Sequence, residues 1–214
     1  MKKIYYGKAV YDNKEIKAVI NVLRNSNLSL IDGPKVKKIE KTVSKIFGKK
    51  FGLMVNSGSS ANLLGLSSFN LKKGSEIITT NLTFSTTVAP IYQLGLIPHF
   101  IGVKENQFIA DIDQIEKCIN KKTAAIMLPN LLGNVCNWIK VNKLAKKYNL
   151  KVLEDSADTI GYSYNSKNFG KYSDVVTNSF YASHIINGAG FGGIVCFNNL
   201  EEYKKAKLLR GWGR

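Results

Sequence analysis

The 214-residue sequence lacks several features that would place it quickly in a class of protein. No apolar run approaches the roughly 20 residues that a membrane span needs. The basic start MKKIYYGKAV is not followed by the apolar segment of a secretion signal. The three cysteines, Cys118, Cys136 and Cys196, are too few and too widely spaced to suggest a disulfide framework or a metal site. We therefore expect a cytoplasmic protein without a membrane span, whose thiols are reduced.

Acidic residues are scarce, because 15 Asp and Glu stand against 31 Lys and Arg and give a net charge of +16. Such an excess raises the question of nucleic-acid binding. In the densest basic run, KVKKIEKTVSKIFGKK, the Ile, Val and Phe residues recur at helical spacing. We interpret its lysines as the solvated face of an amphipathic helix. A lysine-rich proteome or an anionic small substrate would also account for the charge, and the sequence does not separate these causes.

Short apolar runs alternate with helical patterns along the chain, which favours one α/β domain over residues 1–214. The expected strands cover residues 51–55, 76–80, 97–103, 123–128, 150–155, 174–180 and 192–197. The expected helices cover residues 12–24, 33–46, 58–68, 84–95, 111–120, 138–148 and 199–209. The pattern predicts a mainly parallel seven-stranded sheet with helices on both faces. The final stretch LEEYKKAKLLRGWGR has no closing element, so we expect a longer parent protein.

Small and hydroxyl-bearing residues follow the first expected strand, in the stretch NSGSS at positions 56–60. Backbone N–H groups at a helix N-terminus can converge on an anion, and serine hydroxyls add donors. Ser57, Gly58 and Ser59 are therefore candidates for a phosphate cradle. An ordinary N-capped turn is an equally good interpretation of this stretch alone.

Two carboxylates, Glu154 and Asp155, end another apolar strand in the stretch LKVLEDSADTIGY. Ligands of α/β proteins bind at the carboxyl ends of strands, and a carboxylate there can pair with a protonated heterocyclic nitrogen. Asp158, one helical turn later, could face the same pocket. Alternatively, Asp155 and Ser156 would simply cap the next helix.

Aromatic and imidazole side chains occur at two further strand ends. Phe84 could stack on a planar cofactor, although an isolated phenylalanine usually belongs to a core. The stretch SFYASHIINGAGFGG brings the Ser179 hydroxyl and the His184 imidazole into one loop. His99, the other histidine, is expected to be a strand residue with a satisfied imidazole, whereas His184 can act as a base near neutral pH.

Together these sites describe a pocket for a pyridoxal-type cofactor. The phosphate would bind Gly58 and Ser59 with help from Ser179, and the ring would stack on Phe84. Asp155 would keep the pyridine nitrogen protonated, so that the ring accepts electrons.

Four stretches, NSGSSANLLGL, TTNLTFSTTVAPIYQLGLIPHFIGV, VLEDSADTIGY and SFYASH, resemble the DegT/DnrJ/EryC1/StrS sugar aminotransferases in order and spacing. The resemblance covers nearly the whole chain. It implies a fold-type-I pyridoxal phosphate enzyme about twice as long, with its C-terminal small domain missing here. In the aminotransferases, the residue five after the serine of SFY is the lysine that binds the cofactor covalently. Here that residue is His184.

A smaller branch of this family, the sugar 3-dehydratases, also has histidine at this position and reads SFYPAHH. This sequence is similar in the first histidine and the glycine-rich tail, but has Ala182, Ser183 and Ile185 at the differing positions. An imidazole cannot replace the amine of lysine in a covalent bond to the cofactor, which favours pyridoxamine phosphate held non-covalently. The resemblance then implies dehydration at C3 of a nucleotide-linked 4-keto-6-deoxyhexose, with His184 as base, in 3,6-dideoxysugar synthesis for surface polysaccharide.

The resemblance also implies a homodimer, and in one subgroup an iron–sulfur cluster with a reductase partner, whose ligands lie beyond Arg214. Two rival interpretations remain. One is an aminotransferase that recruits another lysine, such as Lys167 or Lys171. The other is a non-catalytic binding module that uses its positive charge on nucleic acid, which a steep salt dependence of DNA binding would reveal.

Overall fold

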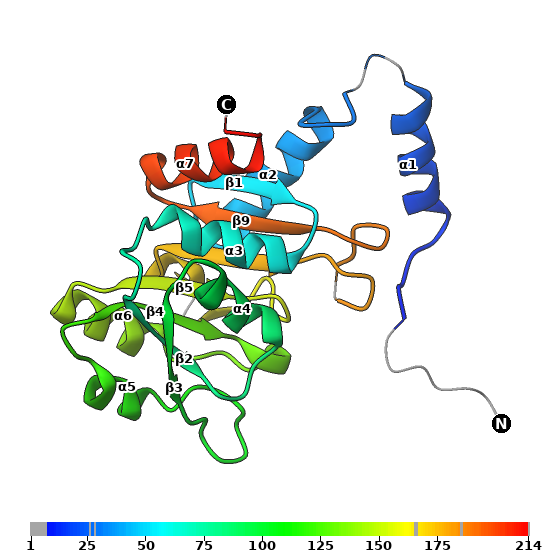
Figure 1. Ribbon diagram of the computed structural model, residues 1–214. Helices are drawn as coiled ribbons and strands as arrows, with labels where there is room; N and C mark the ends of the chain where they lie inside the picture. The colour runs from blue at the N-terminus through cyan, green and yellow to red at the C-terminus, as the bar shows by residue number, and fades with distance from the viewer. Residues whose placement is uncertain (1–7, 26, 28, 165–166, 185, 214) are drawn as a thin grey trace.

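The structure, a computed structural model, describes residues 8–213 apart from residues 26, 28, 165, 166 and 185. Helices and strands alternate along most of this range (Figure 1). The strands of the main sheet are β1 (Phe51–Val55), β2 (Glu76–Thr80), β3 (Ile97–Ile101), β4 (Thr123–Pro129), β5 (Lys151–Asp155), β8 (Val175–Ser179) and β9 (Gly193–Phe197). The α-helices are α1 (Asn13–Arg24), α2 (Pro34–Ile46), α3 (Gly58–Ser68), α4 (Ser85–Gln93), α5 (Ile112–Cys118), α6 (Trp138–Tyr148) and α7 (Leu200–Arg210).

The seven strands form one sheet in the order β1-β9-β8-β5-β4-β2-β3. β9 is antiparallel to its neighbours β1 and β8, and the other neighbouring pairs are parallel. The predicted mainly parallel sheet is therefore confirmed. Each predicted strand and helix is present, with ends that differ by at most two residues.

Shorter elements were missed, because two to four residues give too little periodicity for a prediction. They are the 3-10 helices η1 (Leu131–Gly133) and η2 (Phe169–Tyr172) and a hairpin of β6 (Ser163–Tyr164) and β7 (Lys167–Asn168). η1 lies at the edge of the sheet where the candidate site is found, so this omission affects the site.

Helices cover both faces of the sheet, and the alternation of side chains along each strand feeds two cores. On β5, Leu153 packs in the core that includes residues of α3, α4 and α7. Its neighbour Val152 packs in the opposite core, with residues of α5 and α6. The same alternation directs Asp155 toward α3 and α4 and directs Glu154 to the other face.

Helix α2 largely confirms the interpretation of the basic run. Its lysines are exposed, while Val43 packs against residues of β8 and β9. Lys49, just after the helix, departs from that interpretation because it is only 6% exposed. Its Nζ donates to the carbonyl oxygens of Ser173 and Asp174, the latter at 3.1 Å. Burial lowers the pKa of Lys49 to about 8.

Helix α1 stands apart from the body of the molecule (Figure 1). Its start is fixed by a capping box, in which the Asp12 carboxylate accepts the Lys14 N–H at 2.6 Å and Glu15 accepts the Asp12 N–H at 2.8 Å. None of its residues is buried. The helix therefore forms through local bonds and leaves its apolar stripe uncovered by the described residues.

Two further expectations concern membranes and thiols. In the part of the chain that the structure describes, no helix combines the length and the apolarity needed to cross a bilayer. The three cysteines are free thiols, as predicted, and Cys136 and Cys196 are buried. Burial raises the pKa of both buried thiols, that of Cys136 to about 12.

Candidate active site

The predicted site residues gather at one edge of the sheet. β1, β2, β5 and β8 run in the same direction, so their carboxyl ends share this edge. Such an edge is where open α/β sheets bind ligands. The residues found there are Ser57, Gly58 and Ser59 after β1, Phe84 after β2, Asp155 and Asp158 at and after β5, and Ser179 and His184 at and after β8.

Ser57, Gly58 and Ser59 form the N-terminal turn of α3. The Ser57 hydroxyl accepts the Ser60 N–H at 3.1 Å, so the predicted N-cap is confirmed. The N–H groups of Gly58 and Ser59 come before the first intrahelical bond and have no carbonyl of an earlier turn to bind. A methyl group on Gly58 would stand 2.7 Å from Cβ of Ser179. The turn thus lies against the end of β8 and can present N–H groups and hydroxyls to one anion.

Asp155 is buried between α3 and α4, with 5% exposure. Its Oδ2 accepts hydrogen bonds from Asn62 Nδ2 and Thr87 Oγ1, both at 2.8 Å, and its Oδ1 accepts the Ala157 N–H at 3.1 Å. Burial raises the pKa of Asp155, although these bonds oppose the rise. Among the described residues, no Lys, Arg or His forms an ion pair with it. Its carboxylate is therefore ordered by neutral donors and lacks a counter-charge from them.

Glu154 points to the opposite face and is fully buried. It accepts hydrogen bonds from the hydroxyls of Tyr162, Ser156 at 2.7 Å and Ser173 at 3.3 Å. Burial raises the pKa of Glu154, and the positive charge of Lys49 lowers it. The Glu154 carboxylate is thus already hydrogen-bonded to donors of the protein itself.

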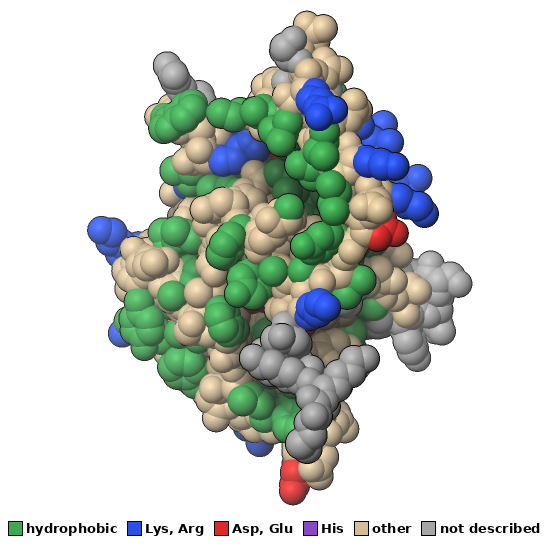
Figure 2. All heavy atoms as spheres, turned by 90° about the vertical axis from the view of Figure 1, so that its right-hand side faces the viewer, with side chains coloured by type: hydrophobic (Ala, Val, Ile, Leu, Met, Phe, Trp, Pro, Cys, Tyr) green, Lys and Arg blue, Asp and Glu red, His purple; other side chains and the backbone are tan. Residues whose placement is uncertain are grey.

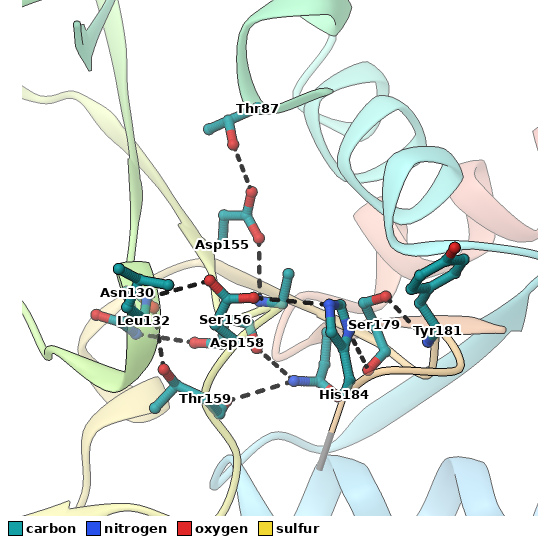
Figure 3. A network of polar contacts seen from close by, with 12 residues as sticks. Thr87, Asn130, Leu132, Asp155, Ser156, Asp158, Thr159, Ser179, Tyr181 and His184 are labelled. Atoms are coloured by element: carbon teal, nitrogen blue, oxygen red, sulfur yellow. Dashed lines mark hydrogen bonds and ion pairs between the residues drawn. The ribbon is translucent and has the colours of Figure 1, made fainter. Parts of the chain in front are cut away.

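His184 occupies the loop between β8 and β9 (Figure 3). Its Nδ1 lies 3.4 Å from the carbonyl oxygen of Ser179, and its Nε2 lies 3.6 Å from Oδ1 of Asp158. The Tyr181 ring meets the imidazole edge-on, with ring centroids 5.9 Å apart. The side chain is 23% exposed, so the imidazole is ordered and can still be reached by a ligand.

Asp158 lies beside His184 and is held from its other side by backbone (Figure 3). Its Oδ2 accepts the N–H of Leu132 in η1 at 3.1 Å. The loop that carries it is fixed by Asn178, whose Nδ2 donates to the carbonyl oxygens of Ser156 and, at 3.3 Å, Thr159. The structure therefore brings Asp158 to the predicted edge, while its cofactor contact stays a prediction.

Phe84 is 69% exposed at the N-cap of α4. The common alternative, a phenylalanine buried in the core, is therefore wrong at this position. Its carbonyl oxygen accepts the Thr87 N–H at 3.0 Å, which links its turn to the donor that binds Asp155. Stacking on a cofactor stays a prediction.

Sequence reasoning missed the amide and hydroxyl side chains that order this edge. Asn62 and Thr87 hold Asp155, and Asn130 joins the ends of β4 and β5. The Asn130 backbone N–H donates to the Asp155 carbonyl at 2.8 Å. A polar residue such as Asn62 among the apolar residues of α3 was the available signal, but its partner is 93 residues away in the chain.

The remaining candidates lie elsewhere. His99 is in β3, with Nδ1 3.4 Å from Oε2 of Glu76, which confirms that it is a strand residue with a partner. Lys171 is exposed and lines a hollow with Ser173 and Asp174, at the start of β8 and thus at the opposite edge of the sheet. The side chain of Lys167 is outside the described residues.

The arrangement fits a phosphorylated pyridine of the pyridoxal type. The first turn of α3 offers donors for a phosphate, and the tight contact of Gly58 with Ser179 keeps side chains out of that turn. The buried Asp155 carboxylate can gain its missing counter-charge from a protonated ring nitrogen. His184, at the same edge, supplies a group that can transfer protons.

Comparisons with known proteins agree with this fit. A model of the DegT/DnrJ/EryC1/StrS aminotransferase family matches residues 10–214. The dTDP-4-dehydro-2,6-dideoxy-D-glucose 3-dehydratase of Saccharopolyspora spinosa is 36% identical over 195 residues, covering 87% of this chain and 42% of the relative. The GDP-4-keto-6-deoxy-D-mannose 3-dehydratase of Escherichia coli O55:H7 is 34% identical over 215 residues, covering 96% and 54%. The chain thus spans about half the length of these relatives.

Solved structures give the same result. A GDP-4-keto-6-deoxymannose-3-dehydratase with a trapped PLP-glutamate geminal diamine has a TM-score of 0.91 and 32% identity, covering 99% of this chain and 55% of that one. PseC of Helicobacter pylori, an aminotransferase of pseudaminic acid biosynthesis, has a TM-score of 0.90 and 33% identity, covering 98% and 56%. With the family match over residues 10–214, these likenesses show that the chain belongs to the DegT/DnrJ/EryC1/StrS aminotransferase family and has the fold-type-I architecture.

Proposed function

We propose that the whole protein catalyses the pyridoxamine-phosphate-dependent C3 dehydration of a nucleotide-linked 4-keto-6-deoxyhexose. The observation that carries this proposal is His184, which lies beside Asp158 and the Ser179 carbonyl. The resemblance of the stretch SFYASH to the family assigns this position to the cofactor-binding lysine of the aminotransferases. The similarity to two sugar 3-dehydratases supports the same reaction class. A role in 3,6-dideoxysugar synthesis for surface polysaccharide follows from this chemistry.

In this proposal the cofactor is held without a covalent bond. The first turn of α3 and the Ser179 hydroxyl bind the phosphate, and Asp155 pairs with the protonated pyridine nitrogen. The exposed Phe84 ring flanks the cofactor ring. When bound, pyridoxamine phosphate supplies an amine that reacts with a ketone and a ring that accepts electrons.

His184 moves the protons of the reaction. In this proposal the hydrogen of the neutral ring is on Nδ1, which faces the Ser179 carbonyl, and Nε2 takes a proton as general base. The same nitrogen then donates that proton to the departing C3 hydroxyl, which leaves as water. One imidazole therefore serves both proton transfers.

The completion of the reaction is left out of the proposal. Among the described residues, no three His, Cys, Asp or Glu side chains gather as metal ligands. Hydrolysis of the dehydrated product and reductive release remain separate outcomes of the assay below.

The test uses the full-length protein with pyridoxamine phosphate and a nucleotide-linked 4-keto-6-deoxyhexose, and follows the sugar by mass spectrometry. We expect loss of the C3 oxygen, abolished in His184→Asn and retained in the matched variant His99→Asn. Gain of an amino group without that loss would overturn the proposal.

An aminotransferase is the second candidate, because PseC, named as an aminotransferase, is 33% identical. Lys171 is a poor substitute for the missing lysine, since it lies at the start of β8 with Ser173 and Asp174. Borohydride reduction of the cofactor-loaded protein separates the two candidates. A covalent cofactor adduct on any lysine would favour the aminotransferase.

We also propose a homodimer. Hydrophobic side chains face outward on the side of the molecule where the β8–β9 loop lies (Figure 2). Tyr181, Ile186 and Phe191 of that loop are 47%, 47% and 71% exposed. Such a patch next to a site favours a protein partner. Sedimentation of the full-length protein tests this, with Phe191→Glu expected to shift the equilibrium toward monomer.

A further inference from the structure

Both ring nitrogens of His184 face oxygen atoms that can only accept hydrogen bonds. Nδ1 faces the carbonyl oxygen of Ser179 at 3.4 Å, and Nε2 faces a carboxylate oxygen of Asp158 at 3.6 Å (Figure 3). A neutral imidazole carries one N–H and can serve one of these acceptors, whereas an imidazolium serves both. The surroundings are therefore arranged for the ring after it has taken a proton.

Asp158 is itself fixed, unlike a freely moving surface carboxylate. Its second oxygen accepts the Leu132 N–H at 3.1 Å. Leu132 has φ 54° and ψ 32°, a left-handed conformation that is unfavourable for a residue with a Cβ. The turn is anchored next to it, where Asn130 Oδ1 accepts the Cys136 N–H at 3.1 Å and the Trp138 Nε1–H at 3.0 Å. A strained but anchored turn thus directs one backbone N–H at Asp158.

We propose that Asp158 is a positioning residue for His184, and not a ligand of the cofactor. The Ser179 carbonyl keeps a hydrogen on Nδ1, so that Nε2 is the basic nitrogen. Asp158 stabilises the imidazolium formed when Nε2 takes a proton, and it holds that proton until it is transferred onward. This role rests on the proposed function, because it assigns His184 to proton transfer, and it replaces the cofactor contact predicted for Asp158.

Other groups around the imidazole do not supply this charge. Tyr181 presents a ring edge from the same loop. Asp155, on β5, is buried between its own donors; burial and, to a smaller extent, the negative charge of Asp158 raise its pKa. The first turn of α3 carries no acidic residue. Among the described residues, Asp158 is the carboxylate within ion-pair distance of His184.

The chain contains a matched comparison in its other histidine. His99 Nδ1 lies 3.4 Å from Oε2 of Glu76, so each histidine has one carboxylate neighbour. His99 is a strand residue of β3, away from the candidate site. Variants of Glu76 and Asp158 can therefore be compared histidine by histidine in one spectrum.

The experiment is ¹⁵N NMR of the cofactor-free full-length protein with labelled histidine, at about pH 6.5, near the ordinary histidine value. Signals are assigned with His184→Asn and His99→Asn. In Asp158→Asn we expect the ratio of doubly to singly protonated His184 to fall about two- to fivefold, the size of an exposed ion pair. The same ratio for His99 should not change in Asp158→Asn. In Glu76→Gln the ratio should fall for His99 and stay unchanged for His184. The hydrogen of neutral His184 should stay on Nδ1.

Asp158→Glu keeps the charge and is expected to recover part of the ratio. An unchanged ratio in Asp158→Asn, an equal fall in Asp158→Glu, or a neutral ring with its hydrogen on Nε2 would each overturn the proposal. If Asp158→Asn does not fold, 1 M NaCl on the unaltered protein replaces it, because salt screens a partly exposed pair. A salt-insensitive His184 then counts against the role. Since no cofactor or substrate is present, failure here is distinct from failure of the dehydration assay.

Discussion

Glu154 and Asp155 are neighbours at the end of β5, yet their surroundings differ in one decisive respect. Both are buried, and burial raises the pKa of both carboxyl groups. Glu154 accepts hydrogen bonds from hydroxyl groups, and the positive charge of the buried Lys49 opposes the rise in its pKa. Asp155 accepts hydrogen bonds from Asn62 and Thr87, and the charge that acts on it is the negative charge of Asp158. Among the described residues, neither carboxylate forms an ion pair.

The difference separates a structural carboxylate from one suited to a ligand. A buried charge is costly unless it is paired. Lys49 places a positive charge near Glu154, whereas in the proposed function a ligand supplies the charge opposite Asp155. Alternation along β5 puts the two side chains on opposite faces, so one strand end serves the fold on one face and, in the proposed function, a cofactor on the other.

The largest effect is expected from Asp155→Asn. Loss of the buried charge opposite the pyridine nitrogen should weaken binding of pyridoxamine phosphate by about 10²- to 10³-fold, the usual cost of leaving one member of a buried pair. Isothermal titration of the full-length protein measures it. Glu154→Gln is the matched control, and an equal loss in both variants would break the comparison.

The pH dependence of stability should report Lys49. Its folded pKa of about 8 lies below the ordinary value near 10.4. Between these values the unfolded state binds more protons, so stability rises with pH in that window. Lys49→Met should remove about 2.5 kcal/mol of this rise, measured by urea unfolding at pH 8 and at about pH 10.5. Lys50 is exposed, so Lys50→Met should leave the rise of stability with pH unchanged. An equal loss of this rise in both variants would contradict its assignment to Lys49.

Glu154→Gln should lower the free energy of unfolding by about 2 kcal/mol, because buried hydroxyl donors lose a charged acceptor and Lys49 loses a nearby negative charge. Denaturant unfolding measures this. Glu201→Gln, an exposed carboxylate on α7, is the control and should change stability little. If Glu154→Gln is neutral for stability and weakens cofactor binding instead, the structural role of Glu154 is wrong.

The smallest effect is expected at the first turn of α3, the proposed phosphate site. Gly58→Ala places a methyl group 2.7 Å from Cβ of Ser179. Because this shifts the donor N–H groups, binding of pyridoxamine phosphate should become about tenfold weaker. Pyridoxamine without phosphate should bind equally to both proteins. Ser59→Ala keeps its backbone N–H, so its affinity for pyridoxamine phosphate should fall less than that of Gly58→Ala. Equal losses for both ligands would place the phosphate elsewhere.

Much of the fold could be predicted from local pattern. The apolar runs and helical periodicities predicted the helices and the strands of the main sheet to within two residues. The order of strands with helical crossovers predicted the shared edge to which Ser57, Asp155 and His184 belong. η1 was missed because three residues carry no periodicity, and with it the Leu132 N–H that binds Asp158.

The lysine run shows where local pattern fails. Helical spacing correctly predicted exposed lysines on α2, but Lys49 lies beyond the helix and is buried beside Ser173 and Asp174. Nothing in its neighbours distinguishes it from Lys50. Its burial follows from contacts with residues about 125 positions later in the chain.

The sequence by itself determined the fold class and the family, because these depend on residue type and on spacing within single elements. Only the tertiary structure decided which polar groups meet: Asn62 with Asp155, Lys49 near Glu154, and Asp158 with His184. The physical reason is that hydrogen bonds and charge pairs act over a few ångströms between segments that the sheet brings together. Periodicity along the chain carries no record of those distances.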